Sequence, residues 1–276
     1  MRLARVVLAL LTVVPPALSA QRAFSRGDSD AEWLENCRDN WRGDRDRGRA
    51  CEVRAVPVKL AGRAIEIDGR ENGSIRVFGW DGDSVRVTAR MQAQADDDAE
   101  AAKLLKDVRI VTDGRSVRAE APRGDSWYRS GWSVSYTVEV PRRFDLGLEA
   151  HNGSLRVDGV TGRLDLRTTN GSVALQDVGG DVHARTQNGS MNVALAGTSW
   201  DGSGLDAETQ NGSVRLEIPQ KYAAQIETGT VNGAINTDFP VTVQGRISRR
   251  LSLPLNGGGK TIRVTTTNGG VRLSTR

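Results

Sequence analysis

The sequence predicts an all-β protein, a single-stranded parallel β-solenoid (β-helix) with short coils of about 18–23 residues and one short inserted helix. Three observations predict this fold. A phrase of the form Thr-x-Asn-Gly-Ser recurs at a nearly constant interval, apolar and polar residues alternate on both sides of it, and a second bend rich in glycine separates the repeats. An interval near twenty residues is typical of architectures in which each repeat stacks on the next.

The spacing of the asparagines in this phrase gives the number of residues in each coil. Successive asparagines are 18, 18 and 23 residues apart from Asn152 to Asn211. The asparagines of the phrase at equivalent corners are Asn152, Asn170, Asn188, Asn211 and Asn232, flanked by Thr168, Thr186, Thr209 and Thr230. Because equivalent positions stack in a solenoid, we expect the side-chain amides to form a ladder.

The residues between the phrases read as strands. Leu164 and Leu166 alternate with charged residues before one Asn-Gly corner, and Val173 and Leu175 alternate with other residues after it. A period of two indicates strand rather than helix. Asn-Gly is also the strongest local signal for a two-residue hairpin, so an antiparallel meander is the rival fold. The constant phrase, and the absence of an equally tight turn at the other end of each strand pair, favour the solenoid.

Residues 1–20 have the layout of a secretory signal peptide. Two arginines precede the apolar run 6–14, and small residues close the segment. We expect the mature protein to be exported, to the periplasm or to the cell surface or extracellular space. The alternative is a short N-terminal membrane anchor; no later segment is long and apolar enough to span a bilayer.

Residues 21–52 form a polar stretch rich in Arg, Asp and Gly, for which we expect a flexible or loosely packed leader. It contains Cys37 and Cys51, the two cysteines of the chain. In an exported protein such a pair most simply forms one disulfide. The alternatives are two free thiols or a metal site completed by His151 and His183, but the spacing is not that of a zinc site.

Residues 53–276 are expected to form the β-solenoid domain. An Asn-Gly-Ser phrase at Asn72 shows that the repeat pattern begins early. The segment 96–107 interrupts it with acids at its start, Ala and Leu in its middle and Lys near its end, which predicts a helix of two to three turns. We expect Leu104, Leu105 and Val108 to pack this helix against the sheets as a cover.

The candidate binding residues are the aromatics Trp127, Tyr128 and Trp132, in or beside the polar loop 123–131. Exposed aromatic rings can stack on sugars or on a protein partner. The alternative, which we favour, is that they fold back and plug an open end of the solenoid. The strand at 271–273 either pairs with the preceding coil or leaves an exposed edge through which the protein could self-associate.

Charge and motifs exclude several classes of function. Without residues 1–20 the chain carries 36 basic and 34 acidic residues and is nearly neutral, so nucleic acid is not an expected partner. We expect no catalytic residues, no metal and no cofactor, because no nucleophile, metal or phosphate motif occurs. The aspartates near the corners are scattered and do not form a recurring pair.

The signal peptide, the cysteine pair, the inserted helix and the Asn-Gly-Ser corners at Asn152, Asn170, Asn188 and Asn211 together resemble a bacterial family of unknown function that is grouped with adhesins and related to adhesin-head GIN domains. The resemblance covers residues 53–276. It implies an exported β-solenoid without an established enzymatic activity, and it brings no functional residues with it.

Two classes of function follow from these observations. The first is an exported, non-catalytic, adhesin-like protein that binds a surface, glycan or envelope protein through a flat strand face or the aromatic loop. The second is a periplasmic envelope scaffold or signalling partner that acts by protein–protein association. A polysaccharide-active enzyme ranks third, since parallel β-helices also host such enzymes.

Overall fold

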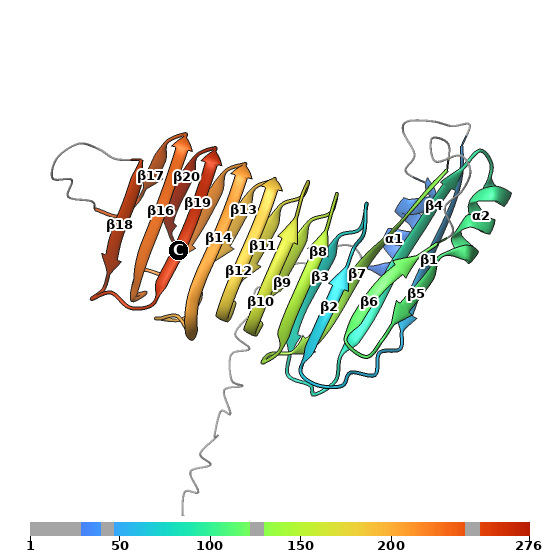
Figure 1. Cartoon of the computed structure of the whole chain (residues 1–276), viewed down its shortest axis with the longest axis horizontal. Coiled ribbons are helices and arrows are strands. Elements are labelled where there is room, and N and C mark those ends of the chain that lie inside the picture. The colour runs from blue at the N-terminus through green and yellow to red at the C-terminus, as the bar shows by residue number, and fades with distance from the viewer. Residues whose placement is uncertain (1–28, 40–46, 122–129, 241–248) are drawn as a thin grey trace, which may run out of the picture.

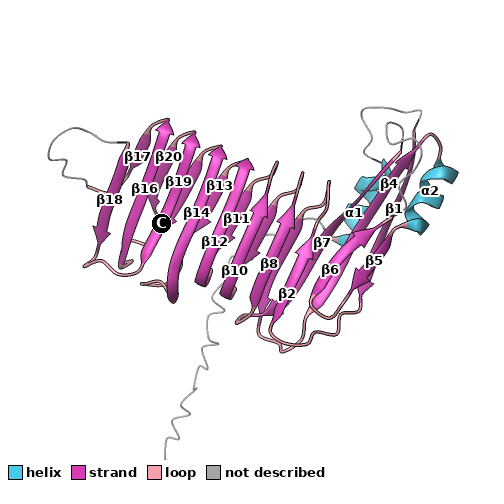
Figure 2. Cartoon of the chain, in the orientation of Figure 1, coloured by secondary structure: helices cyan, strands magenta, loops and turns pink. Residues whose placement is uncertain are grey.

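The computed structural model describes residues 29–39, 47–121, 130–240 and 249–276. Within these ranges the chain forms two ten-stranded sheets that face one another, with two helices at one end (Figures 1 and 2). Sheet A contains, in spatial order, β1 (Gly48–Val56), β4 (Arg86–Ala95), β7 (Gly131–Pro141), β3 (Ile75–Trp80), β9 (Leu155–Asp158), β11 (Val173–Gln176), β13 (Met191–Ala194), β15 (Val214–Ile218), β20 (Val271–Thr275) and β17 (Ile235–Thr237). Sheet B contains β18 (Arg250–Leu255), β16 (Ala224–Asn232), β19 (Thr261–Asn268), β14 (Gly202–Asn211), β12 (Gly179–Asn188), β10 (Thr161–Thr168), β8 (Asp145–Ala150), β2 (Ala64–Asp68), β6 (Ser116–Glu120) and β5 (Arg109–Thr112). The helices are α1 (Asp30–Asp39) and α2 (Asp98–Asp107).

The central repeats wind as coils that give one strand to each sheet. The strand before each Asn-Gly corner joins sheet B and the strand after it joins sheet A, as in β10 and β11 or β12 and β13. Equivalent residues of successive repeats are paired in parallel, so that Leu164 lies opposite Val182 and Val173 lies opposite Met191. This parallel register excludes the antiparallel meander for the central coils, and the strand assignments from alternation are confirmed there.

The core lies between the two sheets and consists of the alternate, inward-facing side chains. Leu164, Leu166 and Val173 are completely buried, and their counterparts in the neighbouring coils are also buried. Full burial of such a side chain contributes about 1.5–3 kcal/mol. Stacking therefore buries a continuous aliphatic core that no single repeat could bury by itself.

An asparagine ladder runs along the corner where the chain passes from sheet B to sheet A. Each side-chain Nδ2 donates to the Oδ1 of the preceding rung at 2.7–3.1 Å. The rungs, in spatial order, are Asn72, Asn152, Asn170, Asn188, Asn211, Asn268 and Asn232. Asn72 and Asn268 thus extend the five predicted positions, and Asn232 follows Asn268 rather than Asn211.

Buried threonines form a second row beneath the asparagines. The Oγ1 of Thr209 donates to the Gly189 carbonyl at 2.7 Å, and the threonines of the other coils repeat this contact with the corner glycine of a neighbouring coil. The corner glycines are required by close stacking. A Cβ atom at Gly189 would lie 2.1 Å from the carbonyl oxygen of Gly171, so any side chain there would hold the coils apart.

Both ends of the fold depart from the predicted purely parallel solenoid. β1, β4 and β7 pair antiparallel, as do β5 with β6 and β16 with β18. The prediction of an exclusively parallel, single-stranded coil was therefore wrong for the ends. A parallel coil needs a full turn of chain to pair its edge, whereas an antiparallel strand pairs it through a local connection.

The order of the coils in space also differs from their order in the chain. The coil formed by β19 and β20 lies between the coil of β14 and β15 and the coil of β16 and β17 (Figure 1). The strand at 271–273 is consequently paired on both sides. It is therefore not an exposed edge, and of the two expected alternatives the pairing with a neighbouring coil is confirmed. The strands at this end of the two sheets are β17 and β18.

The two helices cover opposite faces of sheet A at one end. α2 is confirmed close to its predicted position, with Asp97 as N-cap, and it packs Ala101 and Leu105 against the inner faces of β4 and β1. α1 lies on the outer face, where Asp30 forms an ion pair of 2.9 Å with Arg90 of β4. None of the helices in the described ranges is long and apolar enough to cross a membrane.

The segment predicted as a loose leader is partly folded into the body of the protein. α1 and the first residues of β1 fall within it, and a disulfide between Cys37 and Cys51 joins them. The helix had a local signal that the prediction passed over. Ser29 and Glu32 form a capping box, in which each side chain accepts a hydrogen bond from the backbone N–H of the other.

Candidate functional site

Of the three aromatic residues predicted to bind a partner, one lies within the described residues. Trp127 and Tyr128 lie outside the described residues. Trp132 is the second residue of β7 and lies on the inward-facing row of that strand, half-buried against the core. Its ring therefore contributes to packing at this end of the fold.

The predicted signal peptide, 1–20, also lies outside the described residues. The side-chain amides of the ladder form hydrogen bonds with one another, and the two cysteine sulfurs form the disulfide. These groups stabilise the fold and are not candidates for contact with a ligand. A candidate binding surface must therefore be found on the outward-facing rows of the two sheets, which the sequence analysis named only as flat strand faces.

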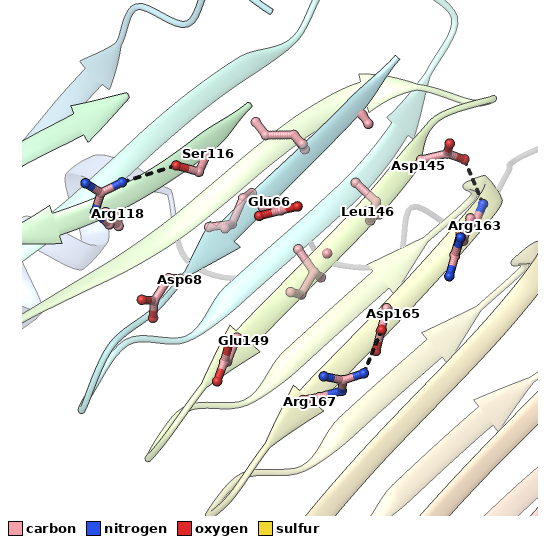
Figure 3. A pocket seen from close by; sticks show the side chains of 15 residues that line it. Glu66, Asp68, Ser116, Arg118, Asp145, Leu146, Glu149, Arg163, Asp165 and Arg167 are labelled. Carbon is pink, nitrogen blue, oxygen red and sulfur yellow. Dashed lines mark hydrogen bonds and ion pairs between the residues drawn. The ribbon is translucent and has the colours of Figure 1, made fainter. Parts of the chain in front are cut away.

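A groove of about 630 Å³ lies on the outer face of sheet B, over β2, β8 and β10 (Figure 3). It forms at Gly147, which lies between Glu66 of β2 and Asp165 of β10 in the same register. Because glycine has no side chain, the row of outward-facing side chains is interrupted there and the backbone of β8 is uncovered. A Cβ atom at Gly147 would meet the Cγ of Glu66 at 3.1 Å.

Charged side chains surround the groove. Five carboxylates and three guanidinium groups line it: Glu66, Asp68, Asp145, Glu149, Asp165, Arg118, Arg163 and Arg167. Several are already engaged. Asp165 forms an ion pair of 2.9 Å with Arg167, and the Oδ1 of Asp145 accepts a hydrogen bond from the backbone N–H of Arg163 at 2.8 Å.

Two carboxylates of the groove have no hydrogen-bond or ion-pair partner among the residues that the structure describes. They are Glu66 of β2 and Glu149 of β8, on neighbouring strands (Figure 3). Ionised carboxylates accept hydrogen bonds and attract cations. The groove can therefore bind a polar ligand that brings donors or positive charge.

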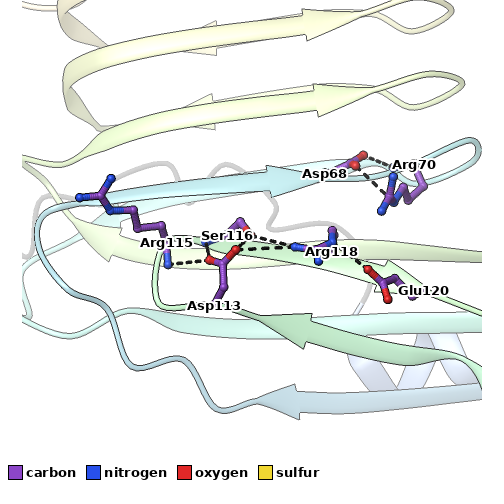
Figure 4. A network of polar contacts seen from close by, with 7 residues as sticks. All are labelled: Asp68, Arg70, Asp113, Arg115, Ser116, Arg118 and Glu120. Atoms are coloured by element: carbon purple, nitrogen blue, oxygen red, sulfur yellow. Dashed lines mark hydrogen bonds and ion pairs between the residues drawn. The ribbon is translucent and has the colours of Figure 1, made fainter.

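A polar network fixes one border of the groove (Figure 4). Asp113 accepts hydrogen bonds from the backbone N–H groups of Arg115 and Ser116 and from the Ser116 hydroxyl at 2.7–3.0 Å. These bonds, with the Ser116 N–H first, lower the pKa of Asp113 to about 2. Arg118 is held by Glu120 at 2.9 Å and by Asp113 at 3.7 Å, so its guanidinium is positioned before any ligand arrives.

Comparison with known proteins gives one family. The sequence profile of the Toastrack DUF4097 family matches residues 137–274, from within β7 to within β20. Among curated proteins, none matches the chain significantly.

Three solved structures overlap most of the chain at 11% identity. A candidate cell adhesion protein of Clostridium sporogenes covers 82% of this chain and 100% of its own, with a TM-score of 0.48. A candidate adhesin of Bacteroides fragilis covers 82% and 97%, with a TM-score of 0.37. A candidate lipid-binding protein of Parabacteroides distasonis covers 81% and 96%, with a TM-score of 0.29. TM-scores below 0.5 do not establish a common fold.

Proposed function

The chain belongs to the Toastrack DUF4097 family, and from this premise we propose that it is an exported, non-catalytic binding protein of the adhesin type. Residues 1–20 direct export, and residues 53–276, with α1 tied on by the disulfide, form the binding module. The layout of residues 1–20 and the disulfide, which persists in oxidising compartments, support export.

The contact surface in this proposal is the groove at Gly147. The observation that carries it is the pair of carboxylates Glu66 and Glu149, which have no partner within the described part of the chain, beside the uncovered backbone at Gly147. Strands pinned on both sides by parallel pairing hold these side chains on a rigid surface. Such a surface suits an extended ligand with hydrogen-bond donors or cationic groups, such as an amino sugar chain or a basic protein segment.

The test is a binding screen of the purified protein against immobilised glycans and extracellular matrix proteins. The double variant Glu66→Gln and Glu149→Gln keeps the shape of the groove and removes its free charge, so we expect at least tenfold weaker binding of any ligand found. Glu217→Gln, on the outer face of sheet A, is the matched control and should bind normally. Equal binding by all three proteins would exclude the groove, and no binding at all would refute the adhesin-like function.

The second hypothesis is a periplasmic envelope scaffold or signalling partner that acts by protein–protein association. β20 offers no free edge for it, because it is paired on both sides, whereas β17 and β18 lie at the ends of the two sheets. Size-exclusion chromatography with light scattering tests it. A stable oligomer in the absence of ligand would restore association as the main function.

A further inference from the structure

A second hollow, of about 360 Å³, lies on the outer face of sheet A, on the opposite side of the protein from the groove at Gly147. It spans β13, β15, β20 and β17. The polar residues that line it are Ser190, Asn192, Ser213, Arg215, Asn236 and Arg272. All of these side chains carry hydrogen-bond donors, and no carboxylate is among the described residues that line the hollow.

The repeat itself builds this hollow. Asn192, Arg215, Arg272 and Asn236 occupy one row across the four strands, because the strands are paired in register. The row before it contains the serines of the Asn-Gly-Ser phrase in the coils of β13 and β15, whereas the phrase reads Asn-Gly-Ala in the coil of β17 and Asn-Gly-Gly in the coil of β20. Gly270 therefore leaves the space that a larger side chain fills in the other coils.

Arg215 and Arg272 are direct neighbours on adjacent parallel strands, whose backbones lie about 4.8 Å apart. Like charges directly opposite one another destabilise a sheet. Arg272 has one carboxylate within reach, that of Asp238 at 3.4 Å, whereas no ion pair or hydrogen bond of the Arg215 side chain occurs among the described residues. The fold therefore carries an electrostatic cost here that a bound anion would remove.

A comparable pair on sheet B shows the difference. Arg167 and Arg185 are also direct neighbours, but each has a carboxylate partner, Asp165 at 2.9 Å and Glu208 at 3.8 Å. Their charges are thus balanced within the protein, while those of Arg215 and Arg272 are balanced only in part.

We propose that the hollow at Gly270 is a binding site for the acidic groups of an anionic polysaccharide. The two guanidinium groups hold a carboxylate or sulfate by charge-assisted hydrogen bonds, and the serine hydroxyls and asparagine amides bond the neighbouring sugar hydroxyls. The same row continues through Asn192 and Ala174 to a second arginine pair on β9 and β3. It consists of Arg156, whose guanidinium lies 3.7 Å from the carboxylate of Asp158, and Arg76. An extended polymer with repeated negative charges can contact both pairs, which a single small anion cannot do. This site is separate from the groove on sheet B and does not depend on it.

The experiment measures binding of the purified protein to polygalacturonate, dextran sulfate and neutral dextran at low and high salt. We expect at least one charged polymer to bind, more weakly at high salt, and neutral dextran not to bind. The carboxylate and sulfate arms distinguish the two sources of the anionic group. Binding should weaken at least tenfold in the double variant R215Q/R272Q and remain unchanged in R185Q/R263Q, which removes the same charge from the other sheet, outside the groove at Gly147.

Several results would overturn the proposal. They are equal losses in the two double variants, which would indicate general charge attraction, equal binding of neutral dextran, or no binding of either charged polymer. Binding to phosphatidylglycerol vesicles in place of the polymers would replace the polysaccharide by a lipid surface. Because the arginine pair costs stability, the melting temperature of R215Q/R272Q should equal or exceed that of the wild type; a clear decrease would show that the arginines serve the fold instead.

Discussion

Replacing the corner glycine Gly189 with alanine tests how tightly the coils must stack. The added Cβ atom would lie 2.1 Å from the carbonyl oxygen of Gly171 and 2.5 Å from its carbon, where ordinary contact begins at 3.4 Å. The two coils would have to separate locally by about 1 Å, because a packed interior yields little elsewhere.

Such a separation breaks the hydrogen bonds around the corner. Three of them join the coil of Gly189 to the coil of Gly171, with donor–acceptor distances of 2.7–2.8 Å. They run from the Asn188 side-chain amide to Asn170, from the Asn188 backbone N–H to the Thr169 carbonyl, and from the Thr186 hydroxyl to the Gly171 carbonyl. Lengthening by 1 Å takes each beyond the hydrogen-bonding range. At about 1 kcal/mol each, the loss is about 3 kcal/mol.

The assay is urea denaturation, with thermal unfolding as a second measurement. A loss of about 3 kcal/mol in folding stability corresponds to a decrease of about 6–12 °C in melting temperature for a protein of this length. Gly62→Ala is the control, because no atom lies within 4 Å of the Cβ position there. We expect its stability to stay within about 0.5 kcal/mol of the wild type. If Gly189→Ala were equally harmless, close stacking would not be the reason for the glycine.

Three further predictions concern other contacts. Thr209 is fully buried and donates to the Gly189 carbonyl, so Thr209→Val should lose about 1–2 kcal/mol in urea denaturation, while Thr209→Ser keeps the donor and should lose less; equal stability of the valine variant and the wild type would contradict this. The pKa of Asp113 is lowered to about 2, so its carboxylate contributes folding stability above its ordinary pKa near 4, and this stability is lost as the pH falls toward 2. In Asp113→Asn the midpoint of urea denaturation should therefore fall less steeply between pH 4 and pH 2 than in the wild type. Parallel pH profiles of the two proteins would refute the role given to Asp113. The double variant C37S/C51S opens a loop of 14 residues and should lose about 3 kcal/mol of folding stability, measured as a lower melting temperature under non-reducing conditions. Unchanged global stability, with faster hydrogen exchange in α1 alone, would contradict this prediction.

The candidate surfaces were largely beyond sequence reasoning. Gly147 and Gly270 are ordinary glycines in the chain, and they become hollows only because pairing sets them among larger outward-facing neighbours. The register was predictable from the repeat, so a search for repeats that lack a side chain at an outward position could have found Gly270. Gly147 and its neighbour Glu66 gave no such signal, because β2 and β8 are separated in the chain by β3 to β7.

The sequence by itself determined the alternation, the parallel pairing of the central coils, the helix α2 and the asparagine corners. Each of these depends on residues close together in the chain or on the period of the repeat, and both are visible without a structure. Close stacking also follows from the repeat, because every corner carries the same asparagine and glycine.

Only the tertiary structure decided which coil neighbours which, and how the ends close. Since the corners from Asn170 onward present the same asparagine, glycine and threonine, any of these coils can stack on any other, and the repeat cannot specify that Asn268 lies between Asn211 and Asn232. The choice depends on the summed packing of whole coils and on the chain between them. For the same reason the antiparallel strands at both ends could not be predicted, because they satisfy edges that exist only after the coils have stacked.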